Sequence, residues 1–596
     1  MLEPQSRAAL TEQLAPPTGF ELSHAVGTTF TLDLASALAV PLSFASHRLS
    51  AQPDTLGVLD AIRRASDRVD IFAQAGELSL GTRSDLVAFL EPMIHPVATR
   101  RGLFHPKVWF LEYRSGRTFS YRFLCASRNL AADRSWDVVV RLDGTPARAD
   151  ARGASEVNRP LADLLNTLPT LTVQPMEPDR RTRLTELAER WRNIEWEAPD
   201  PMRKVGFHAL GISGAVMPDL RGKRALIISP FVSDDGLKML RTNVGTETHL
   251  VSRDESLERL ASATLDARLS TYVLDDAASP SVDADSEEAA PTSERLSGLH
   301  AKVVVVDRGD GAHVLLGSAN ATHAAWQANV EVMVELVGPI PRVGVQATLD
   351  ALGSLIEEHP TEGGAQPDEK EELQRRLEAF VRRLASARLT ARVLPAEPHS
   401  VRVWADDAFV DALTQRIDVS VHWHLLTRPD LGDSAIAASE AEAAILADVP
   451  LADITPFIVL VARDDAGNER RTIVLARLLD DVPSRRDAII ARQLTDRAAF
   501  VRLLTLLLEL SGAGVISTDS ANGTGFFGIA DASGVGTGLF EALVRAVGEG
   551  HQGLDDAKRI IEYLRESDAQ AVLPDGFQQL WSAIWSAHLE LTGEGA

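Results

Sequence analysis

Two copies of the tripeptide His-x-Lys lie 195 residues apart in this chain, and similar polar residues follow each copy. With 15 histidines and seven lysines among 596 residues, chance predicts about 0.18 occurrences, the product of the two counts divided by the length. Two matching half-sites in one chain therefore indicate one active site that is built from both. The first half-site contains His105, Lys107, Asn129 and Asp137, and the second contains His300, Lys302, Asn320 and Glu331.

These residue types suit the cleavage of a phosphodiester without a metal or another cofactor. One imidazole can attack phosphorus and form a phosphohistidine, while a second, protonated imidazole donates to the leaving oxygen. Lysine ammonium groups and asparagine amides can neutralise and fix the non-bridging oxygens as charge develops. A carboxylate can orient each histidine by accepting its other N–H. We therefore predict that all eight residues are catalytic, and that no metal-ligand set is required. The spacing alone does not say which histidine attacks.

Lysine is rare in this chain, which makes the two motif lysines informative. Apart from seven lysines, every basic residue counted in the total of 60 is an arginine. An ammonium is a compact point charge, whereas a guanidinium is a broad planar fork. Retention of Lys107 and Lys302 therefore favours a tight site around one tetrahedral phosphoryl group.

The two halves share a coarse order of elements. Residues 69–74 and 225–231 are predicted to be buried strands, followed by helical segments at 84–90 and 234–242. Each His-x-Lys then precedes a β-branched and aromatic run. Because residues i and i+2 share a face in extended chain, His105 with Lys107, and His300 with Lys302, are expected to face one cleft.

The second motif, His-x-Lys-x4-Asp followed by Gly-Ser-x-Asn and Glu331, resembles the HKD motif of the phospholipase D superfamily. The first copy departs from that pattern twice, because Glu112 replaces the Asp and Ala126 replaces the Gly. The resemblance spans roughly residues 55–340. It implies two pseudo-symmetric α-β-α sandwich lobes with the active site at their seam, and it favours His105 as the nucleophile.

Four further motif residues are expected to support the site rather than to react. No triad surrounds the two serines, so a turn or hydrogen-bonding role is preferred to a nucleophilic one. The two carboxylates at the fifth position after lysine are expected to be structural. These supporting residues are Ser127, Ser318, Glu112 and Asp307.

The remainder of the chain divides by pattern into further units. Helical periodicity follows residue 340, and strand-like and helical pieces after residue 396 predict a separate α+β accessory domain. The fold class is therefore α/β: two phospholipase D-like lobes and an α+β C-terminal domain. The predicted divisions are 1–54 packing on lobe 1, 55–175 as lobe 1, 200–342 as lobe 2, 343–395 as a helical connector, and 396–596 as the accessory domain.

Composition limits the class of protein. One cysteine excludes an intrachain disulfide framework. Neither a bilayer-spanning apolar run nor a signal peptide is recognisable, so a cytoplasmic protein without a membrane partner is expected. The net charge of −24 includes an acidic, Ala/Ser/Pro-rich stretch at 275–294 that predicts a disordered insert in lobe 2. This insert either competes with nucleic acid for the site or is a neutral spacer.

The substrate is the open question, and a nuclease is the preferred interpretation. Basic residues near the motifs would attract a polyanion, with DNA preferred to RNA. The resemblance to bacterial defence nucleases implies an anti-phage role and leaves open a helicase or ATPase partner and a homo-oligomer. The alternatives are a phospholipase that acts as a cell-suicide effector and a non-catalytic nucleic-acid-binding scaffold. The predicted nucleic-acid-binding residues are Arg100, Arg101, Arg128 and Arg295.

Overall fold

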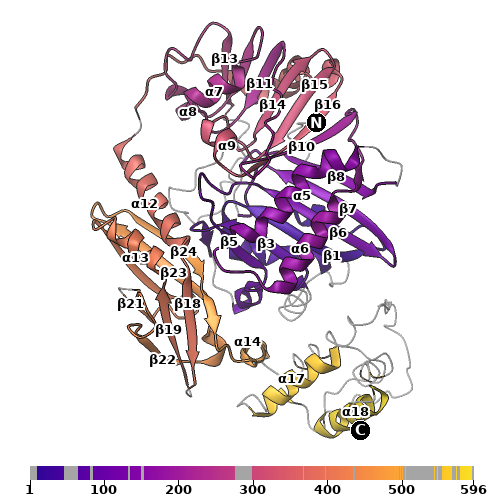
Figure 1. Cartoon of the computed structure of the whole chain (residues 1–596), viewed down its shortest axis with the longest axis vertical. Helices are drawn as coiled ribbons and strands as arrows, with labels where there is room; N and C mark the ends of the chain where they lie inside the picture. The colour runs from indigo at the N-terminus through magenta and orange to yellow at the C-terminus, as the bar shows by residue number, and fades with distance from the viewer. Residues whose placement is uncertain are drawn as a thin grey trace, which may run out of the picture.

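The computed structural model describes most of the chain. The described residues are 10–45, 65–80, 85–131, 135–148, 153–275, 298–366, 368–395, 398–433, 436–494, 497, 500, 504, 543, 547, 553–566, 572–573 and 577–592. Residues 276–297, which include most of the predicted insert and Arg295, lie outside them, as do most of residues 495–552 in the predicted accessory domain. Figure 1 shows the second lobe at one end of the long axis, the first lobe in the middle, and helices α17 and α18 at the other end.

The first lobe is built on a seven-stranded sheet with strand order β5-β3-β1-β6-β7-β8-β9. Strands β1, β3 and β5 are parallel, and β6, β7 and β8 are antiparallel. One face carries α1 (Leu10–Leu14), α2 (Leu34–Ala37), α3 (Ala39–Ala45) and the 3-10 helix η1 (Asp85–Leu90), and the other carries α5 (Ala154–Leu171) and α6 (Pro178–Trp191). The strands are β1 (Glu21–Thr29), β3 (Val69–Gln74), β5 (Ile94–Val97), β6 (Val108–Ser115), β7 (Thr118–Ala126), β8 (Val139–Pro146) and β9 (Ile194–Trp196).

The second lobe has an eight-stranded sheet in the order β10-β16-β15-β14-β11-β12-β13-β17. Helices α7 (Asp234–Arg241), α8 (Asp254–Glu258) and α9 (His323–Gln327) cover one face, and α10 (Ile340–Val343) and α11 (Val345–Leu352) cover the other. The strands are β10 (Lys204–Leu210), β11 (Arg224–Ile228), β12 (Thr248–Val251), β13 (Leu269–Leu274), β14 (Val303–Arg308), β15 (Gly311–Gly317), β16 (Glu331–Gly338) and β17 (Ile356–Glu358). Both lobes are therefore α-β-α sandwiches, and the α/β fold class is confirmed.

The N-terminal strand corrects the predicted correspondence between the halves. Strand β1 lies inside the first sheet, between β3 and β6, although the sequence placed residues 1–54 outside the lobe. In both lobes a hydroxyl after this strand makes the same two bonds. Thr29 Oγ1 donates to the carbonyl of Thr31 at 2.8 Å and accepts from Leu130 N at 2.9 Å. Ser229 Oγ donates to the carbonyl of Phe231 at 2.7 Å and accepts from Ala321 N at 2.9 Å. In the pseudo-symmetric comparison of the lobes, β1 is thus the counterpart of β11. The predicted strand at 69–74 (β3) is the counterpart of β12.

Other boundaries also shift. Residues 85–90 form the 3-10 helix η1 within the helical segment predicted at 84–90, and α11 ends at residue 352 before β17 joins the second sheet. Helix α11 packs on β11 and β14, so it belongs to the second lobe instead of the predicted connector at 343–395.

The two lobes share one hydrophobic core. Residues of both sheets join α5, α6, α10 and α11 in a single buried cluster. At its centre, Phe123 of β7 meets Phe207 of β10 with ring centroids 5.4 Å apart, and Trp191 of α6 packs on Phe123 and Phe110. Burial of several aromatic side chains across one seam fixes the lobes relative to each other.

The C-terminal region contains two four-stranded sheets, in the orders β22-β19-β18-β25 and β21-β20-β23-β24, as an α+β domain requires. Its contact with the first lobe includes buried Glu77, which accepts hydrogen bonds from Arg382 at 2.8 Å and Arg470 at 2.9 Å. The elements are α12 (Glu369–Ala385), β18 (Leu389–Leu394), β19 (His399–Ala405), α13 (Asp407–Thr414), β20 (Val419–Leu425), β21 (Gly432–Asp433), β22 (Ile445–Val449), β23 (Phe457–Asp464), β24 (Glu469–Leu475), β25 (Arg477–Leu479), α14 (Arg485–Gln493), α17 (Gly553–Glu566) and α18 (Phe577–Thr592). None of the helices in the described residues combines the length and apolar character that crossing a membrane requires.

A buried ionic cluster ties three strands of the first sheet to α6. Asp70 of β3 contacts His24 at 3.0 Å, His95 at 2.7 Å and Arg180 at 2.8 Å. Burial alone would raise the pKa of the Asp70 carboxyl, but the hydrogen bonds from His24 and His95 outweigh it and hold that pKa far below its ordinary value. The carboxylate is therefore ionised and fully paired.

We expect Asp70→Ala to lower the free energy of unfolding by about 3–5 kcal/mol, because it removes the buried carboxylate that lies closest to the guanidinium of Arg180. Urea denaturation followed by tryptophan fluorescence measures the change. Asp219→Ala, which removes an exposed carboxylate paired with Arg221, is the matched control and should leave the transition midpoint unchanged. Equal midpoints for both variants would contradict a stabilising role of the cluster.

Candidate active site

Short cross-lobe backbone pairings hold the two histidines. The segment before His105 pairs with the segment before Glu331: His105 N donates to Val330 O at 2.9 Å, and Val330 N donates to Leu103 O at 2.8 Å. The same pattern repeats in the other half, where His300 N donates to Trp136 O at 2.8 Å. The histidines therefore lie just before β6 and β14, and each is anchored to the opposite lobe.

A glycine permits this approach. Gly102 has a φ of +66°, and a Cβ at this position would lie 2.4 Å from the carbonyl oxygen of Ala328 in the second lobe. Any other residue would therefore combine backbone strain with a direct clash. The loop that leads to His105 can contact the second lobe because this residue is glycine.

Glu331 joins the half-sites through side chains. Its Oε2 lies 2.9 Å from Nδ1 of His105, and it also accepts a hydrogen bond from Ser318 Oγ. Its Oε1 accepts from Asn329 Nδ2 at 3.2 Å. A carboxylate that accepts the Nδ1–H of an imidazole fixes the ring in the tautomer whose Nε2 carries the free electron pair. The second lobe thus orients the histidine of the first.

The second histidine is held differently. His300 is partly buried, and its Nδ1 lies 3.5 Å from Nζ of Lys302. Asp137 follows Trp136, the residue that accepts the His300 backbone bond, so the chain brings this carboxylate to the same seam. Asp137 is half-buried, whereas Glu331 is fully buried. The two motif carboxylates therefore occupy related positions in unequal environments.

Both motif lysines are buried and fold back on their own histidine. Lys107 Nζ donates to the His105 carbonyl at 2.9 Å, and Lys302 Nζ donates to the His300 carbonyl at 2.8 Å. Each lysine therefore needs an anion nearby to keep its charge at low cost.

The Ser-x-Asn segments also match between lobes. Ser127 Oγ accepts from Val138 N at 3.0 Å, and Ser318 Oγ accepts from Val332 N at 3.0 Å. These serines hold the start of β8 and β16, which agrees with a supporting role. The adjacent asparagines each keep a buried Oδ1 without a hydrogen-bond partner, at Asn129 and Asn320. Two matching unsatisfied amide oxygens call for an explanation, and a bound water or ligand that donates a hydrogen bond is one.

The carboxylates at the fifth position after lysine point away from the histidines. Glu112 binds Arg190 of α6 at 2.7 Å and accepts from Ser23 at 2.9 Å. Asp307 binds Arg224 at 3.0 Å and accepts from Val345 N at 3.1 Å. Both fasten a helix or strand onto its own sheet, as the sequence indicated.

Burial lowers the pKa values of the two histidines and the two lysines of the site. For His300 it acts together with the charges of Lys302 and Lys107 and lowers the pKa to about 2. Burial also lowers the pKa of Lys107 to about 7, although Glu331 opposes the shift. The pKa values of His105 and Lys302 are lowered as well, again chiefly by burial. A pKa near 2 makes His300 neutral at pH 7, and a nearby anion would favour its protonated form.

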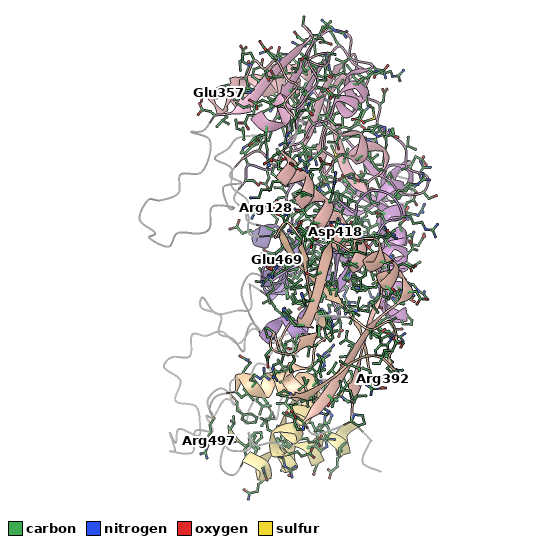
Figure 2. The ribbon with its side chains drawn as sticks, turned by 90° about the vertical axis from the view of Figure 1, so that its left-hand side faces the viewer. Arg128, Glu357, Arg392, Asp418, Glu469 and Arg497 are labelled. Atoms are coloured by element: carbon green, nitrogen blue, oxygen red, sulfur yellow. The ribbon has the colours of Figure 1, made fainter. Side chains whose placement is uncertain are left out.

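The predicted nucleic-acid-binding arginines are only partly placed. Arg100 and Arg101 are exposed on the loop that leads to His105. Arg128 donates to the Ala131 carbonyl at 3.1 Å, and Figure 2 shows it at the edge of the molecule, between Glu357 and Glu469 along the long axis. Their binding role stays a prediction, and Arg295 lies outside the described residues.

Sequence reasoning missed three contacts of the site. The ring of Phe30 lies 5.2 Å from that of His105 and 5.9 Å from Lys107 Nζ. Arg253 donates twice to the Leu299 carbonyl, at 3.2 and 3.0 Å, and Asn329 holds Glu331. None belongs to a repeated motif. Only the proximity of Asn329 to Glu331 in the chain offered a signal.

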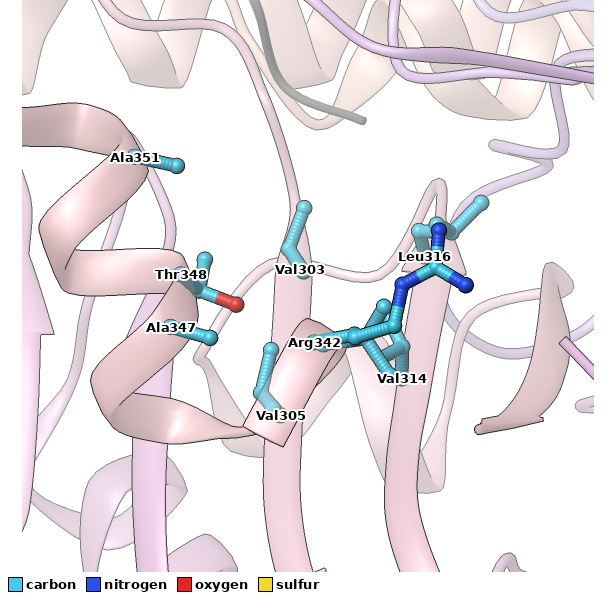
Figure 3. Close-up of a pocket in the computed structure, with 9 residues that line it drawn as sticks. Val303, Val305, Val314, Leu316, Arg342, Ala347, Thr348 and Ala351 are labelled. Atoms are coloured by element: carbon cyan, nitrogen blue, oxygen red, sulfur yellow. The ribbon is translucent and has the colours of Figure 1, made fainter. Parts of the chain in front are cut away.

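An apolar pocket lies beside the site and not in it. Figure 3 shows Ala347, Thr348 and Ala351 of α11 facing Val303 and Val305 of β14 across the pocket. Its lining contains none of the motif histidines, lysines or asparagines. Within the described residues, no group of three or more His, Cys, Asp or Glu side chains has the geometry to hold a metal ion.

No family model and no curated protein matches this chain. Among solved structures, it is similar to the polyphosphate kinase from Porphyromonas gingivalis, with 11% identity and a TM-score of 0.33 over 62% of this chain and 50% of that chain. It is also similar to yeast tyrosyl-DNA phosphodiesterase, with 11% identity and a TM-score of 0.34 over 54% and 84%. It is similar to phosphatidylserine synthase from Haemophilus influenzae Rd KW20 as well, with 14% identity and a TM-score of 0.30 over 63% of this chain and 91% of that chain. The chain spans half the length of the kinase, and any functional assignment rests on the site geometry.

The lowered pKa of Lys107 predicts that anion binding is coupled to proton uptake. At about pH 8 a lysine with a pKa near 7 is mostly neutral when free, and a bound dianion favours its protonated form, so protons enter the protein. Sulfate has no proton to exchange at this pH, and an indicator dye in weak buffer reports the uptake. The Lys107→Arg protein should take up fewer protons when sulfate binds, because a guanidinium is already protonated before binding. Identical uptake by the two proteins would contradict the prediction.

Proposed function

We propose that this protein is a phosphodiesterase of the phospholipase D type that cleaves nucleic acid. The observation that carries the proposal is the contact between Glu331 of one lobe and His105 of the other, at 2.9 Å. An imidazole oriented by a buried carboxylate, next to a second imidazole and two buried lysines, is an arrangement for attack on an electrophile that bears negative charge.

The reaction proceeds in two displacements at one phosphorus atom. His105 Nε2 attacks phosphorus and forms an N–P bond, while the bond to the leaving oxygen breaks and protonated His300 gives its proton to that oxygen. Water then attacks the phosphohistidine, neutral His300 takes a proton from it, and the N–P bond breaks. Lys107 and Lys302, with the amides of Asn129 and Asn320, hold the non-bridging oxygens through both steps.

Nucleic acid is the preferred substrate because its backbone is a chain of phosphodiesters, the group that we propose the site cleaves. The exposed Arg100 and Arg101 lie on the loop that leads to His105, where positive charge would guide a polyanion. We propose DNA rather than RNA as the substrate. The hypothesis includes an anti-phage role and a helicase or ATPase partner. A phospholipase activity is the alternative outcome of the test below.

We expect cleavage of plasmid or single-stranded DNA in the presence of EDTA, because the histidines and lysines supply the nucleophile, the acid and the positive charge. The assay compares DNA, RNA and phosphatidylcholine vesicles in parallel, with and without magnesium. Activity that EDTA abolishes and magnesium restores would contradict the mechanism. Release of a lipid head group without DNA cleavage would assign the phospholipase function instead.

We expect His105→Ala and His300→Ala each to reduce turnover about a thousandfold or more, and the double variant to be little worse, because both groups act on one phosphorus atom. Steady-state kinetics on the preferred substrate measure the effect. His422→Ala, which removes an exposed histidine of β20, is the matched control and should retain full activity. Independent, multiplicative losses would show that the half-sites do not share a reaction.

A further inference from the structure

Phe231 is an apolar residue exposed next to the catalytic seam. It follows β11 by three residues and is 46% exposed. The guanidinium of Arg253 lies over its ring, 4.9 Å from the centroid. The same guanidinium donates to the carbonyl of Leu299, the residue directly before His300. The ring and the cation therefore form one unit that is attached to the backbone of the catalytic histidine.

The fold does not require an aromatic ring at this position. The pseudo-symmetric residue of the first lobe is Thr31, whose carbonyl accepts the hydrogen bond from Thr29 that corresponds to the bond from Ser229 to Phe231. The turn needs only a backbone carbonyl, which any residue provides. The ring of Phe231 is therefore not needed for the turn, and its contact with Arg253 beside the seam makes it available to a ligand.

The position of Arg253 links this unit to the chemistry. Burial and the two lysines dominate the lowered pKa of His300, and the charge of Arg253 adds to them. The same guanidinium contributes to the lowered pKa of Lys302, after burial and Lys107. It is thus within electrostatic reach of any anion that the lysines bind.

We propose that Phe231 and Arg253 form a platform for the nucleotide next to the scissile phosphate, with the base stacked on Phe231 and the phosphate near Arg253. The proposal rests on the proposed function and narrows its substrate to single-stranded nucleic acid. A base can lie on an aromatic ring only when it has left its own stack, and such stacking tolerates every base. An adjacent arginine suits a phosphate-bearing ligand better than an acyl chain.

The test measures binding separately from turnover. All proteins carry His105→Ala so that the ligand stays intact, and fluorescence anisotropy reports the binding of a labelled single-stranded DNA of about 12 nucleotides. We compare Phe231→Ala, Phe231→Trp and the control Ile417→Ala, which removes a 96% exposed side chain from the C-terminal domain. A duplex, an abasic strand of equal length and anionic lipid vesicles are the comparison ligands.

Phe231→Ala should weaken the binding of the single strand about tenfold, whereas Phe231→Trp should retain it and Ile417→Ala should not change it. The abasic strand should bind the Phe231→Ala and reference proteins equally, because it has no base to stack. The platform would be overturned if Phe231→Ala and the reference protein bound the normal strand with equal affinity. It would also be overturned if Phe231→Ala lost as much affinity for the abasic strand as for the normal strand, or lost affinity only for the vesicles. Hydrolysis of methyl p-nitrophenyl phosphate by the wild-type protein tests the phosphodiesterase chemistry itself, so that failure of one proposal is distinguished from failure of the other.

Discussion

The hydrogen bond between Glu331 and His105 is the constraint on which the rest of the structure depends. It joins a residue at the start of β16 to one just before β6, so its 2.9 Å length is kept only if the lobes do not move relative to each other. The shared hydrophobic core and the backbone pairing of residues 103–105 with Val330 provide that rigidity. A catalytic geometry assembled from two lobes tolerates little displacement, because small errors in orientation cost large factors in rate.

The two lobes are related by near two-fold symmetry, but the surroundings of their two histidines differ. Corresponding backbone bonds hold His105 and His300, and corresponding serines hold β8 and β16. The carboxylates differ, since Glu331 is fully buried and bound to the imidazole, whereas Asp137 is one methylene shorter and half-buried. The lobe that carries Arg253 and Phe231 also carries His300, whose pKa burial and the two motif lysines lower to about 2. A symmetric frame with unequal surroundings allows one histidine to act as nucleophile and the other as acid.

The two α-β-α sandwiches were expected from the resemblance that the repeated motif carries. The catalytic role of the eight motif residues was inferred from residue type and spacing, which are local properties of a sequence, and it stays a prediction. The sequence pattern did not predict the position of β1. This strand pairs with β3 and β6, so its place in the sheet is decided by long-range pairing. The contact of Arg253 with the Leu299 carbonyl, which lies outside the motifs, joins residues 46 positions apart. No spacing rule finds such a pair. The supporting parts of Glu112 and Asp307 were predictable, although their arginine partners were not.

We propose that Glu331 of one lobe prepares His105 of the other for attack on phosphorus. His300→Ala, supplied with methyl p-nitrophenyl phosphate, tests it directly, since this leaving group needs no acid while hydrolysis of the intermediate still requires His300. Rapid mixing should give a burst of about one equivalent of p-nitrophenolate, and mass spectrometry after an alkaline quench should place the adduct on His105. Adding Glu331→Gln should remove most of the burst. An adduct on any other residue, or a burst that is insensitive to Glu331, would contradict the account.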